Sequence, residues 1–488
     1  MAVLTIELGQ KVHKLTFDAP KPLKELLESV GMQQPHPCGG RGSCGKCAVR
    51  LEGAVSAPNE AEQKAGTRLS CQAVILGDAR VILQKREDLS QIQTHSQADA
   101  RLGVPMEGST GAAVDIGTTT IALKRYDLRT GALIGESAME NPQVLVAADV
   151  MGRIGAAMEG QLENLQKQVQ DAISQLLSRA GGPVDTMVIT GNTTMLYLLT
   201  GRDPSCLSCV PFEADTLFDV DTRILDASAY LPPCMNAFVG ADITCAVLAS
   251  RMCEKKTALL CDIGTNGEIA LWKDGVLYVT STAAGPAFEG AGISCGCSSI
   301  PGAVDRAWVE NGGLWLHTIG NTKPVGLCGS GLIDVVAALL DLEWMDETGA
   351  LDEDEEMLAP GVVLLQKDIR AMQLAKAAIA AGIQTLLEVS GTDCGQIETL
   401  YIAGGFGSHL NIGSAVKIGL IPEELEEKVQ VIGNAALAGA SQLLLDSRNL
   451  QEVRQIAAKS KHWNLGGNPK FNENYMNAML FPMEDMDW

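Results

Sequence analysis

The sequence has no run of about 18 uncharged apolar residues, which is the length that a membrane-spanning helix needs. Its first residues, Met-Ala-Val-Leu-Thr-Ile-Glu-Leu, lack the basic start and the long apolar stretch of a secretory signal. They alternate between apolar and polar residues, as a β-strand does. We therefore expect a cytoplasmic protein that has no membrane partner.

Basic residues are few compared with acidic ones. The chain has 37 Lys and Arg against 59 Asp and Glu, so its net charge is −22. Nucleic acid and anionic membranes both require basic patches, and the sequence argues against both as partners. The acidity either serves solubility or marks a face that meets a particular protein partner, and the sequence leaves these two interpretations open.

Cysteine is plentiful, and four of the fourteen cysteines stand at the spacing C-x5-C-x2-C-x23-C: Cys38, Cys44, Cys47 and Cys71. Three thiolates this close in sequence can converge on one small inorganic core only if their loop lacks bulky side chains, and this loop is rich in glycine. Its N–H groups can donate to cluster sulfurs. A zinc ribbon would need a second C-x2-C pair, which is absent here. The spacing is close to the plant-type pattern C-x4-C-x2-C…C, so we predict a [2Fe–2S] cluster on these four thiolates.

Residues 1–92 form the first predicted unit. Val3–Leu8 and Lys11–Phe17 alternate as a hairpin does, and Pro22–Val30 has leucines on one helical face. These elements fit the β-grasp fold of [2Fe–2S] ferredoxins. The other ten cysteines lie mostly among small or apolar residues, as buried thiols do. Cys206 and Cys209 could form half of a zinc site or a redox pair, but the second half is missing.

One motif occurs twice in the rest of the chain. Residues 115–123 read Asp-Ile-Gly-Thr-Thr-Thr-Ile-Ala-Leu, and residues 262–271 read Asp-Ile-Gly-Thr-Asn-Gly-Glu-Ile-Ala-Leu. Each copy follows an apolar run and predicts two strands joined by a tight turn. Glycine lets the turn bring N–H groups against a phosphate, and the aspartate can hold a hydrated Mg²⁺ beside it. The predicted nucleotide ligands are Asp115, Gly117, Thr118, Thr119, Thr120, Asp262, Gly264, Thr265, Asn266 and Gly267.

Other elements repeat with the turns. Val188–Leu196 and Val429–Leu437 each read as a strand, then Gly-Asn, then the start of a helix. Tyr401–Asn411 reads as a strand that ends in a Gly-rich turn. We expect Gly404, Gly405 and Gly407 of that turn to lie against the adenosine. Lys376, in a predicted helix over Met372–Glu388, either reaches the nucleotide or is merely solvated.

These motifs resemble the superfamily of actin, sugar and acetate kinases, and heat-shock chaperone ATPases. More narrowly, Asp262–Glu268, Gly285–Ala291 and Gln373–Ile379 resemble the reductive activators of corrinoid proteins, and the cysteine spacing resembles the adrenodoxin-like ferredoxins. The resemblance implies an α/β and α+β multidomain chain, with a β-grasp ferredoxin domain before a duplicated ribonuclease H-like ATPase body. The expected boundaries are 1–92 for the ferredoxin, 93–110 for a linker and 111–488 for the body, whose halves span about 111–255 and 256–488. Some relatives carry a further small domain near the linker, for which this chain has no room.

Two carboxylates are candidates for the group that orients the water attacking ATP. Asp242 begins a predicted helix within Ala237–Ala249, and Glu268 lies beside the second turn. Positioning such a water is worth roughly 10²–10⁴ in rate. We expect Asp242 to have the role and Glu268 to be the next candidate.

An electron carrier joined to an ATPase suggests that ATP drives an uphill electron transfer. Plant-type clusters lie near about −400 mV, so an acceptor of lower potential needs such coupling. The resemblance implies that this acceptor is a corrinoid protein, whose inactive Co(II) returns to Co(I) in a methyltransferase system. The alternatives are a redox-sensing small-molecule kinase, a plain electron carrier with a degenerate body, and a relative of the 2-hydroxyacyl-CoA dehydratase activators. The sequence leaves open the electron donor, which is a protein or a reductant, and whether the chain forms a homodimer.

Overall fold

The computed structural model describes residues 1–8, 11–30, 32, 34, 47–65, 67–83, 94–98, 100–405 and 410–482. Three residues named above, Cys38, Cys44 and Gly407, lie outside these ranges. Within the ranges, no helix combines the length and the apolar character needed to cross a membrane.

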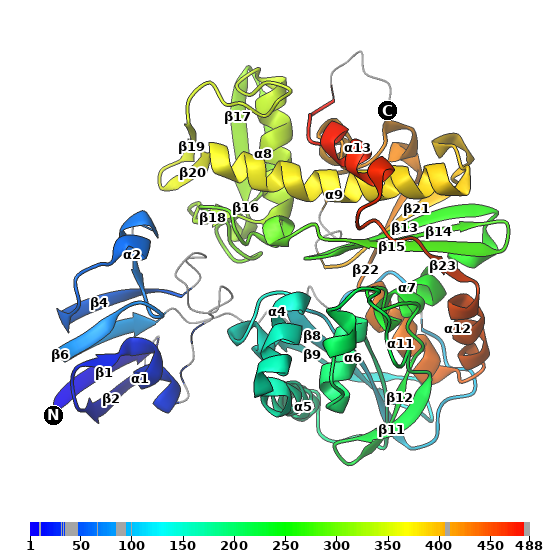
Figure 1. The fold of residues 1–488 in the computed structure, drawn as a ribbon, viewed down its shortest axis with the longest axis horizontal. Helices are drawn as coiled ribbons and strands as arrows, with labels where there is room; N and C mark the ends of the chain where they lie inside the picture. The colour runs from blue at the N-terminus through cyan, green and yellow to red at the C-terminus, as the bar shows by residue number, and fades with distance from the viewer. Residues whose placement is uncertain are drawn as a thin grey trace.

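The N-terminal unit is a mixed sheet with one helix packed on it (Figure 1). β1 (Ala2–Leu8) pairs antiparallel with β2 (Lys11–Phe17), and the sheet order is β2-β1-β6-β4-β5. The predicted hairpin is therefore confirmed. α1 (Leu23–Ser29) buries its three leucines against the sheet, which confirms the predicted helix. The remaining elements are β3 (Lys21–Pro22), β4 (Ala48–Val55), α2 (Glu60–Ala65), β5 (Arg68–Leu69) and β6 (Val74–Leu83).

The first half of the body is a sheet in the order β11-β12-β10-β7-β8-β9. Three antiparallel strands form a meander, and two parallel strands extend it on the other side. The strands are β7 (Thr110–Ile116), β8 (Thr120–Asp127), β9 (Leu133–Glu140), β10 (Thr186–Gly191), β11 (Val220–Ile224) and β12 (Ala227–Leu231). The helical segments are η1 (Pro142–Leu145), α4 (Val150–Ala156), η2 (Ala157–Gln161), α5 (Leu162–Arg179), α6 (Thr193–Thr200), η3 (Ser205–Leu207), α7 (Ala241–Ser250) and η4 (Met252–Glu254).

The second half repeats this arrangement in the order β22-β21-β13-β14-β15-β23. Its strands are β13 (Thr257–Ile263), β14 (Gly267–Lys273), β15 (Val276–Thr282), β21 (Thr399–Ala403), β22 (Val429–Gly433) and β23 (Ser460–His462). Its helical segments are η5 (Pro286–Glu289), α9 (Gln366–Ser390), η7 (Cys394–Gln396), α10 (Ile412–Lys417), η9 (Glu423–Lys428), α11 (Ala435–Leu445), α12 (Asn449–Ala458) and α13 (Pro469–Asn477). When the six strands of each sheet are counted along the chain, the first sheet has the order 3-2-1-4-6-5 and the second has the order 6-3-2-1-4-5. The two sheets share the order 3-2-1-4, so the predicted duplication is a duplication of fold.

A further unit is inserted in the second half between η5 and α9. In Figure 1 it lies to the left of this sheet and extends above it, and α9 runs from it across the second half. Its elements are β16 (Ala303–Glu310), β17 (Gly313–Thr318), η6 (Ile319–Asn321), β18 (Gly326–Leu327), α8 (Gly329–Asp341), β19 (Glu355–Ala359) and β20 (Val362–Leu365).

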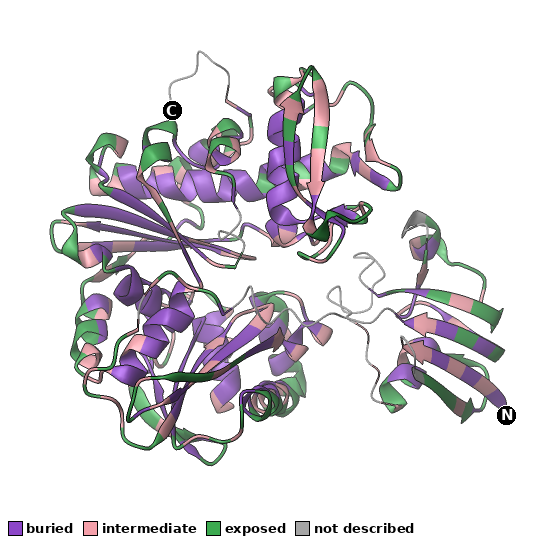
Figure 2. Cartoon of the chain, turned by 180° about the vertical axis from the view of Figure 1, so that it is seen from behind, coloured by how far each residue is buried: buried purple, intermediate pink, exposed green. Residues whose placement is uncertain are grey.

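The two halves are joined by a pair of helices, α7 and α11, which pack between the two sheets. Apolar residues from both halves and both helices form one buried cluster. They are among the buried residues coloured purple in Figure 2. The helices approach closely at Gly439 of α11, where an added Cβ would lie 2.0 Å from the carbonyl oxygen of Cys245 in α7. Only glycine permits this approach, because its hydrogen takes the place of a methyl group.

Residues 94–98 and 100–109 have neither a helix nor a strand, as expected of a linker. They are nevertheless attached to the second half. Their backbone makes hydrogen bonds that follow β22 and α11: Asn434 N to His95 O at 2.9 Å, Gln97 N to Ile432 O at 3.3 Å, Gly103 N to Leu445 O at 3.0 Å, Met106 N to Leu444 O at 3.0 Å and Ser447 N to Val104 O at 2.7 Å. The described part of the predicted linker therefore packs on the second half of the body.

Candidate nucleotide and cluster sites

Both predicted phosphate turns are hairpin turns in the structure. The first joins β7 to β8 and the second joins β13 to β14. Gly117 N donates to Thr120 O at 2.9 Å, and Gly264 N donates to Asn266 O at 3.0 Å. A Cβ on Gly117 would lie 2.7 Å from the oxygen of Thr120, so the first turn requires glycine there.

The two hairpins differ in what faces the aspartate. Asp115 is paired across the strands with Ala122, whereas Asp262 is paired with Glu268. Directly paired residues of antiparallel strands have their side chains on the same face, and like charges in that arrangement repel. The second hairpin therefore carries two adjacent carboxyl groups, and the first carries one.

A fourth carboxylate comes from the first turn of α7. The helix begins after Gly240, where an added Cβ would lie 2.6 Å from the Cα of Asn192, so α7 starts directly against the β10–α6 turn. Asp242 lies in the first turn of this helix and is half-buried. Its Oδ1 accepts a hydrogen bond from Ile243 N at 2.8 Å. Its charge acts on both Asp115 and Asp262. The structure thus brings Asp242 and the two turn aspartates into one electrostatic group.

These carboxyl groups all have raised pKa values. Burial raises the pKa of Asp115 to about 7, with a smaller contribution from Asp262. Burial followed by the charges of Asp115 and Asp262 raises the pKa of Asp242 to about 8, and burial raises the pKa of Asp262 to about 6. Burial, Asp242 and Asp262 raise the pKa of Glu268 well above its usual value. Such mutual repulsion is relieved by a cation.

The described residues contain no group of three His, Cys, Asp or Glu side chains placed to hold a metal ion directly. Mg²⁺ commonly keeps most of its own water shell when it binds to a protein. A hydrated ion can be bound by one or two carboxylates together with phosphate oxygens.

Asn434 supports the first aspartate from the other half of the body. Its Nδ2 donates to Asp115 Oδ2 at 3.0 Å, and its Oδ1 accepts from Leu437 N at 2.8 Å, which caps α11. Asn192 caps α6 in the first half in the same way, with Thr194 N at 3.0 Å. The repeated Gly-Asn pattern predicted both helix starts, but it gave no signal for the bond to Asp115.

Arg153 is a buried cation beneath the first turn, and the sequence pattern did not reveal it. Its guanidinium donates to the backbone oxygen of Thr118, to Ala147 O at 3.1 Å and to Gln143 Oε1 at 3.2 Å. Burial lowers its pKa to about 9, and Asp149 partly offsets that effect. Because its hydrogen-bond partners are neutral, its charge is available to attract an anion bound at the turn.

Glu289 is the second residue that the sequence pattern did not mark as part of the site. Its carboxylate accepts hydrogen bonds from the hydroxyls of Thr119 and Thr265, one in each phosphate turn. A Cβ added to Gly264 would lie 3.7 Å from the same carboxylate. Glu289 therefore lies between the two turns.

The predicted glycines have different surroundings. Gly404 has φ +92°, and its Cβ would lie 2.8 Å from Asp262 Oδ1, so the late turn packs directly on the second aspartate. A Cβ added to Gly405 would have no atom within 4 Å, so this position has free space around it. Gly267 begins β14 and packs against Thr282 and Ile379, so its contacts are with the core. Binding of these residues to adenosine or phosphate stays a prediction.

The contacts of Lys376 give no support for a nucleotide ligand. Its side chain is 1% exposed, and its ammonium donates to the carbonyl oxygen of Leu480 and lies 4.8 Å from the ring centre of Phe481. Burial lowers its pKa to about 7. The predicted helix is present as part of α9. Lys376 on this helix contacts the C-terminal segment. These contacts match neither expectation for Lys376, which were that it reaches the nucleotide or that it is solvated.

Two of the four predicted cluster ligands lie in the described residues. The sulfur atoms of Cys47 and Cys71 are 3.3 Å apart. Two thiolates on one tetrahedral metal with bonds of about 2.3 Å stand roughly 3.8 Å apart, so this pair fits a shared metal. Burial raises the pKa of the Cys47 thiol to about 12, and a metal cation would supply the charge that makes it a thiolate.

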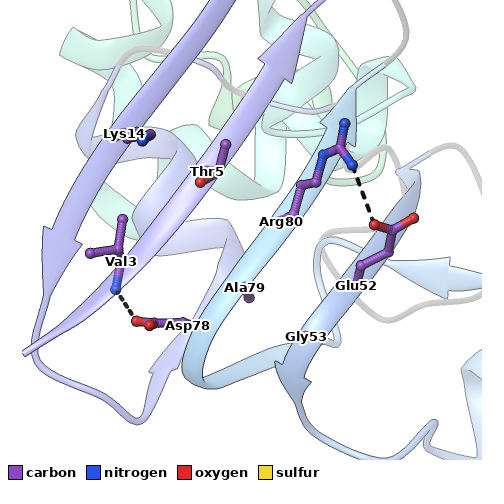
Figure 3. A pocket seen from close by; sticks show the side chains of 8 residues that line it. All are labelled: Val3, Thr5, Lys14, Glu52, Gly53, Asp78, Ala79 and Arg80. Carbon is purple, nitrogen blue, oxygen red and sulfur yellow. Dashed lines mark hydrogen bonds and ion pairs between the residues drawn. The ribbon is translucent and has the colours of Figure 1, made fainter.

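A shallow hollow on the sheet of the same unit has a different character. It is lined by residues of β1, β2, β4 and β6, among them Arg80, which pairs with Glu52 at 3.5 Å (Figure 3). Arg80 also pairs at 2.8 Å with Glu7, which does not line the hollow. Neither described cysteine lines this hollow.

Comparison with known proteins identifies all three regions of the chain. Residues 6–76 match the 2Fe-2S iron-sulfur cluster binding domain. Residues 110–255 match the RACo middle region, and residues 256–488 match the C-terminal domain of RACo, the ASKHA domain. The corrinoid activation enzyme RamQ of Eubacterium limosum is 34% identical over 76% of this chain and 70% of its own length. The chain belongs to the family of reductive activators of corrinoid proteins.

Two more relatives agree with this family. The [Co(II) methylated amine-specific corrinoid protein] reductase of Methanosarcina barkeri is 26% identical over 77% of this chain and 79% of its own. A solved structure named as a reductive activator for corrinoid, iron-sulfur protein superimposes with a TM-score of 0.71 at 26% identity, covering 99% of both chains. The predicted fold class, a ferredoxin domain followed by an actin- and sugar-kinase-like body, is confirmed.

Membership of the activator family settles what the two sites hold in general terms. The N-terminal domain binds a [2Fe–2S] cluster, and the body binds a nucleotide. Glu289 and Asn434 make long-range contacts at the nucleotide site. Asn434 belongs to the repeated Gly-Asn pattern and Glu289 to Gly285–Ala291, but neither pattern indicated these contacts.

Proposed function

We propose that this protein uses ATP to drive one electron from its [2Fe–2S] cluster to the corrinoid of a partner protein. The electron converts inactive Co(II) to Co(I) in a methyltransferase system, while ATP and water give ADP and phosphate. The observation that carries the proposal is that one chain of the activator family joins a cluster domain to a body whose two turns present facing carboxylates. We also propose that it works in the cytoplasm, where thiols stay reduced.

At the cluster end, Cys38, Cys44, Cys47 and Cys71 are the proposed ligands. The cluster, when bound, supplies a one-electron carrier at about −400 mV. Cys47 is buried and Cys71 is partly exposed, so the ligand set reaches from the core of the domain to its surface. A corrinoid partner would dock on this side, because electrons cross only short gaps. A donor protein or a small reductant returns the electron.

At the nucleotide end, Asp115 and Asp262 are the proposed anchors of a hydrated Mg²⁺. The backbone N–H groups and threonine hydroxyls of the two turns would hold the phosphates, and Arg153 would add positive charge beneath them. Asp242 is the proposed residue that orients the attacking water, with Glu268 as the second candidate. Because these groups come from both halves, nucleotide binding would favour one arrangement of the halves over another, which is how ATP can act on a partner.

The test is the optical change from Co(II) to Co(I) in a corrinoid protein under a fixed reductant, with and without Mg-ATP. We expect Co(I) to accumulate only with ATP, and Asp115→Ala to abolish this while its cluster spectrum is retained. Equal Co(I) yields with and without ATP would contradict the proposal. The redox-sensing kinase would then be examined by a search for a phosphorylated small molecule. The relatives described above favour the reductase.

A further inference from the structure

Glu289 links the two halves of the body through the two phosphate turns. It ends η5 in the second half. Its Oε2 accepts from Thr119 Oγ1 at 2.9 Å, and its Oε1 accepts from Thr265 Oγ1 at 2.9 Å. Thr119 belongs to the first half and Thr265 to the second, so one carboxylate uses both of its oxygens to bridge the turns.

The backbone around Glu289 fixes the direction of its side chain. Gly285 N donates to Thr265 O at 2.9 Å, which ties the start of η5 to the second turn. Phe288 is 1% exposed and anchors the segment in the core. After Glu289 the chain turns at Gly290, which has φ +71° and whose Cβ would lie 2.4 Å from the oxygen of Cys297. The carboxylate is therefore presented to the two threonines by a closely packed segment.

A nucleotide phosphate would need the same donors. A threonine hydroxyl carries a single proton and can donate one hydrogen bond at a time. Thr119 and Thr265 therefore cannot donate to Glu289 and to a phosphate together. A carboxylate and a phosphate are both anions, so they also repel each other at this distance.

We propose that Glu289 is a latch, which holds the two phosphate turns together when no nucleotide is bound and which the phosphates displace. The proposal rests on the nucleotide site proposed above. The latch opposes nucleotide binding, because binding must break two hydrogen bonds to a charged group before the hydroxyls can turn to the phosphate. Glu289 is thus a positioning residue that couples the occupancy of the site to the contact between the halves.

The experiment compares the full-length Glu289→Gln variant with the unchanged chain. Calorimetry would measure the affinity for Mg²⁺ together with a non-hydrolysable ATP analogue. The substitution removes the negative charge and keeps the side-chain length, and we expect about tenfold tighter binding. Glu310→Gln is the matched control, because it removes the same charge from an exposed position at the end of β16 in the same half and should leave the affinity unchanged.

A second measurement reports on the latch without any nucleotide. Hydrogen exchange at residues 115–120 and 262–267 should be faster in Glu289→Gln and in Glu289→Ala than in the unchanged chain. In Glu289→Gln, the neutral amide could still accept a hydrogen bond from a threonine. Glu289→Ala removes the acceptor atoms as well as the charge, so it excludes such a remaining bridge. Both variants should retain the cluster spectrum, which shows that the N-terminal domain is folded.

Each outcome has a distinct meaning. Tighter binding with faster exchange supports the latch. Unchanged affinity would place Glu289 outside the phosphate position, and weaker binding would make it a ligand of the nucleotide or its metal; either result overturns the latch. If the unchanged chain binds no analogue at all while its cluster is intact, the proposed nucleotide site fails, and the latch fails with it.

Discussion

Cys47 and Cys71 are 24 residues apart in sequence, yet their sulfur atoms are 3.3 Å apart. We predict that Cys71→Ala removes the visible absorption of the anaerobically purified protein and lowers its iron content from about two per chain. The reason is that a [2Fe–2S] cluster needs all four thiolates. Cys206→Ala, which changes a cysteine of the body, should leave both measurements unchanged. Four irons per chain, or zinc, in the unchanged protein would contradict the prediction.

The carboxylates at the nucleotide site predict how stability depends on pH. Burial and the charges of Asp115 and Asp262 raise the pKa of Asp242 from its ordinary value of 3.8 to about 8, so the folded state holds an extra proton between these pH values. Stability then falls as pH rises through this window, because unfolding releases a proton that only the folded state holds, and proton release is favoured at higher pH.

Replacing Asp242 by Asn removes this penalty. We predict that at pH 8 the free energy of unfolding of Asp242→Asn exceeds that of the unchanged chain by more than about 1 kcal/mol. The variant should therefore unfold at a higher temperature. At pH 5, where the folded carboxyl is protonated, the gain should shrink. Thermal unfolding at both pH values without nucleotide or Mg²⁺ measures this, and an equal gain at pH 5 would mean that the charge is not the cause. The same variant should hydrolyse ATP slowly if Asp242 orients the water.

Arg153 supports the first phosphate turn with a fork of donors that lysine cannot reproduce. Its guanidinium reaches Thr118, Ala147 and Gln143 at once, whereas an ammonium is a single point of charge. We predict that Arg153→Lys lowers the unfolding free energy by about 2 kcal/mol, because buried carbonyl groups lose their donors. It should also weaken binding of the ATP analogue. The exposed Arg202→Lys is the control for the same exchange, and equal stability of the two variants would refute the role.

At the scale of elements, sequence patterns predicted those parts of the body that depend on local structure. The two hairpins, the helix starts after Asn192 and Asn434, and the start of α7 follow from apolar alternation, turn glycines and capping side chains. The duplication was readable because both copies kept these local signals. It predicted the fold class and placed the two turn aspartates at matching positions.

Long-range contacts were not predictable in this way. The bridge from Glu289 to Thr119 joins residues 170 positions apart, and the bond from Asn434 to Asp115 joins residues 319 apart. Lys376 shows the opposite case, in which a plausible residue type on a correctly predicted helix faces the C-terminal segment. Such outcomes depend on how helices and sheets pack, and no local pattern of one sequence encodes that.

The crossing of α7 and α11 gives a prediction for one glycine. A Cβ at position 439 would lie 2.0 Å from the backbone oxygen of Cys245, so Gly439→Ala must push the two helices apart. We predict a loss of more than about 2 kcal/mol in unfolding free energy, even though alanine favours helices. Gly155→Ala is the control, because it changes a helical glycine with nothing within 4 Å of the new methyl group and should be neutral or stabilising. Denaturant unfolding of both variants decides the matter.

At the scale of the whole molecule, the segment from residue 94 to residue 109 connects the ferredoxin side of the chain to the nucleotide site. His95 O accepts from Asn434 N at 2.9 Å, and the side chain of Asn434 donates to Asp115. The same residue thus contacts the segment through its backbone and the candidate Mg²⁺ anchor through its amide. A conformational change at the nucleotide site can therefore be transmitted, through the turn at Asn434, to the segment that precedes the body.

This arrangement predicts where the body can be separated from the ferredoxin. A fragment of residues 94–488 should unfold at the same temperature as the body of the full chain and should bind the ATP analogue equally well. A fragment of residues 111–488 lacks the backbone hydrogen bonds of the segment to β22 and α11. It should unfold at a temperature lower by at least about 3 °C, because each 1 kcal/mol shifts the midpoint of a large domain by a few degrees. Its affinity for the analogue should fall as well, since Asn434 loses the contact that holds its backbone beside Asp115.

Calorimetric scans and nucleotide titrations of both fragments measure these differences. Equal midpoints would show that residues 94–110 are only a spacer, and the coupling of ATP to the electron would then have to run through the corrinoid partner alone.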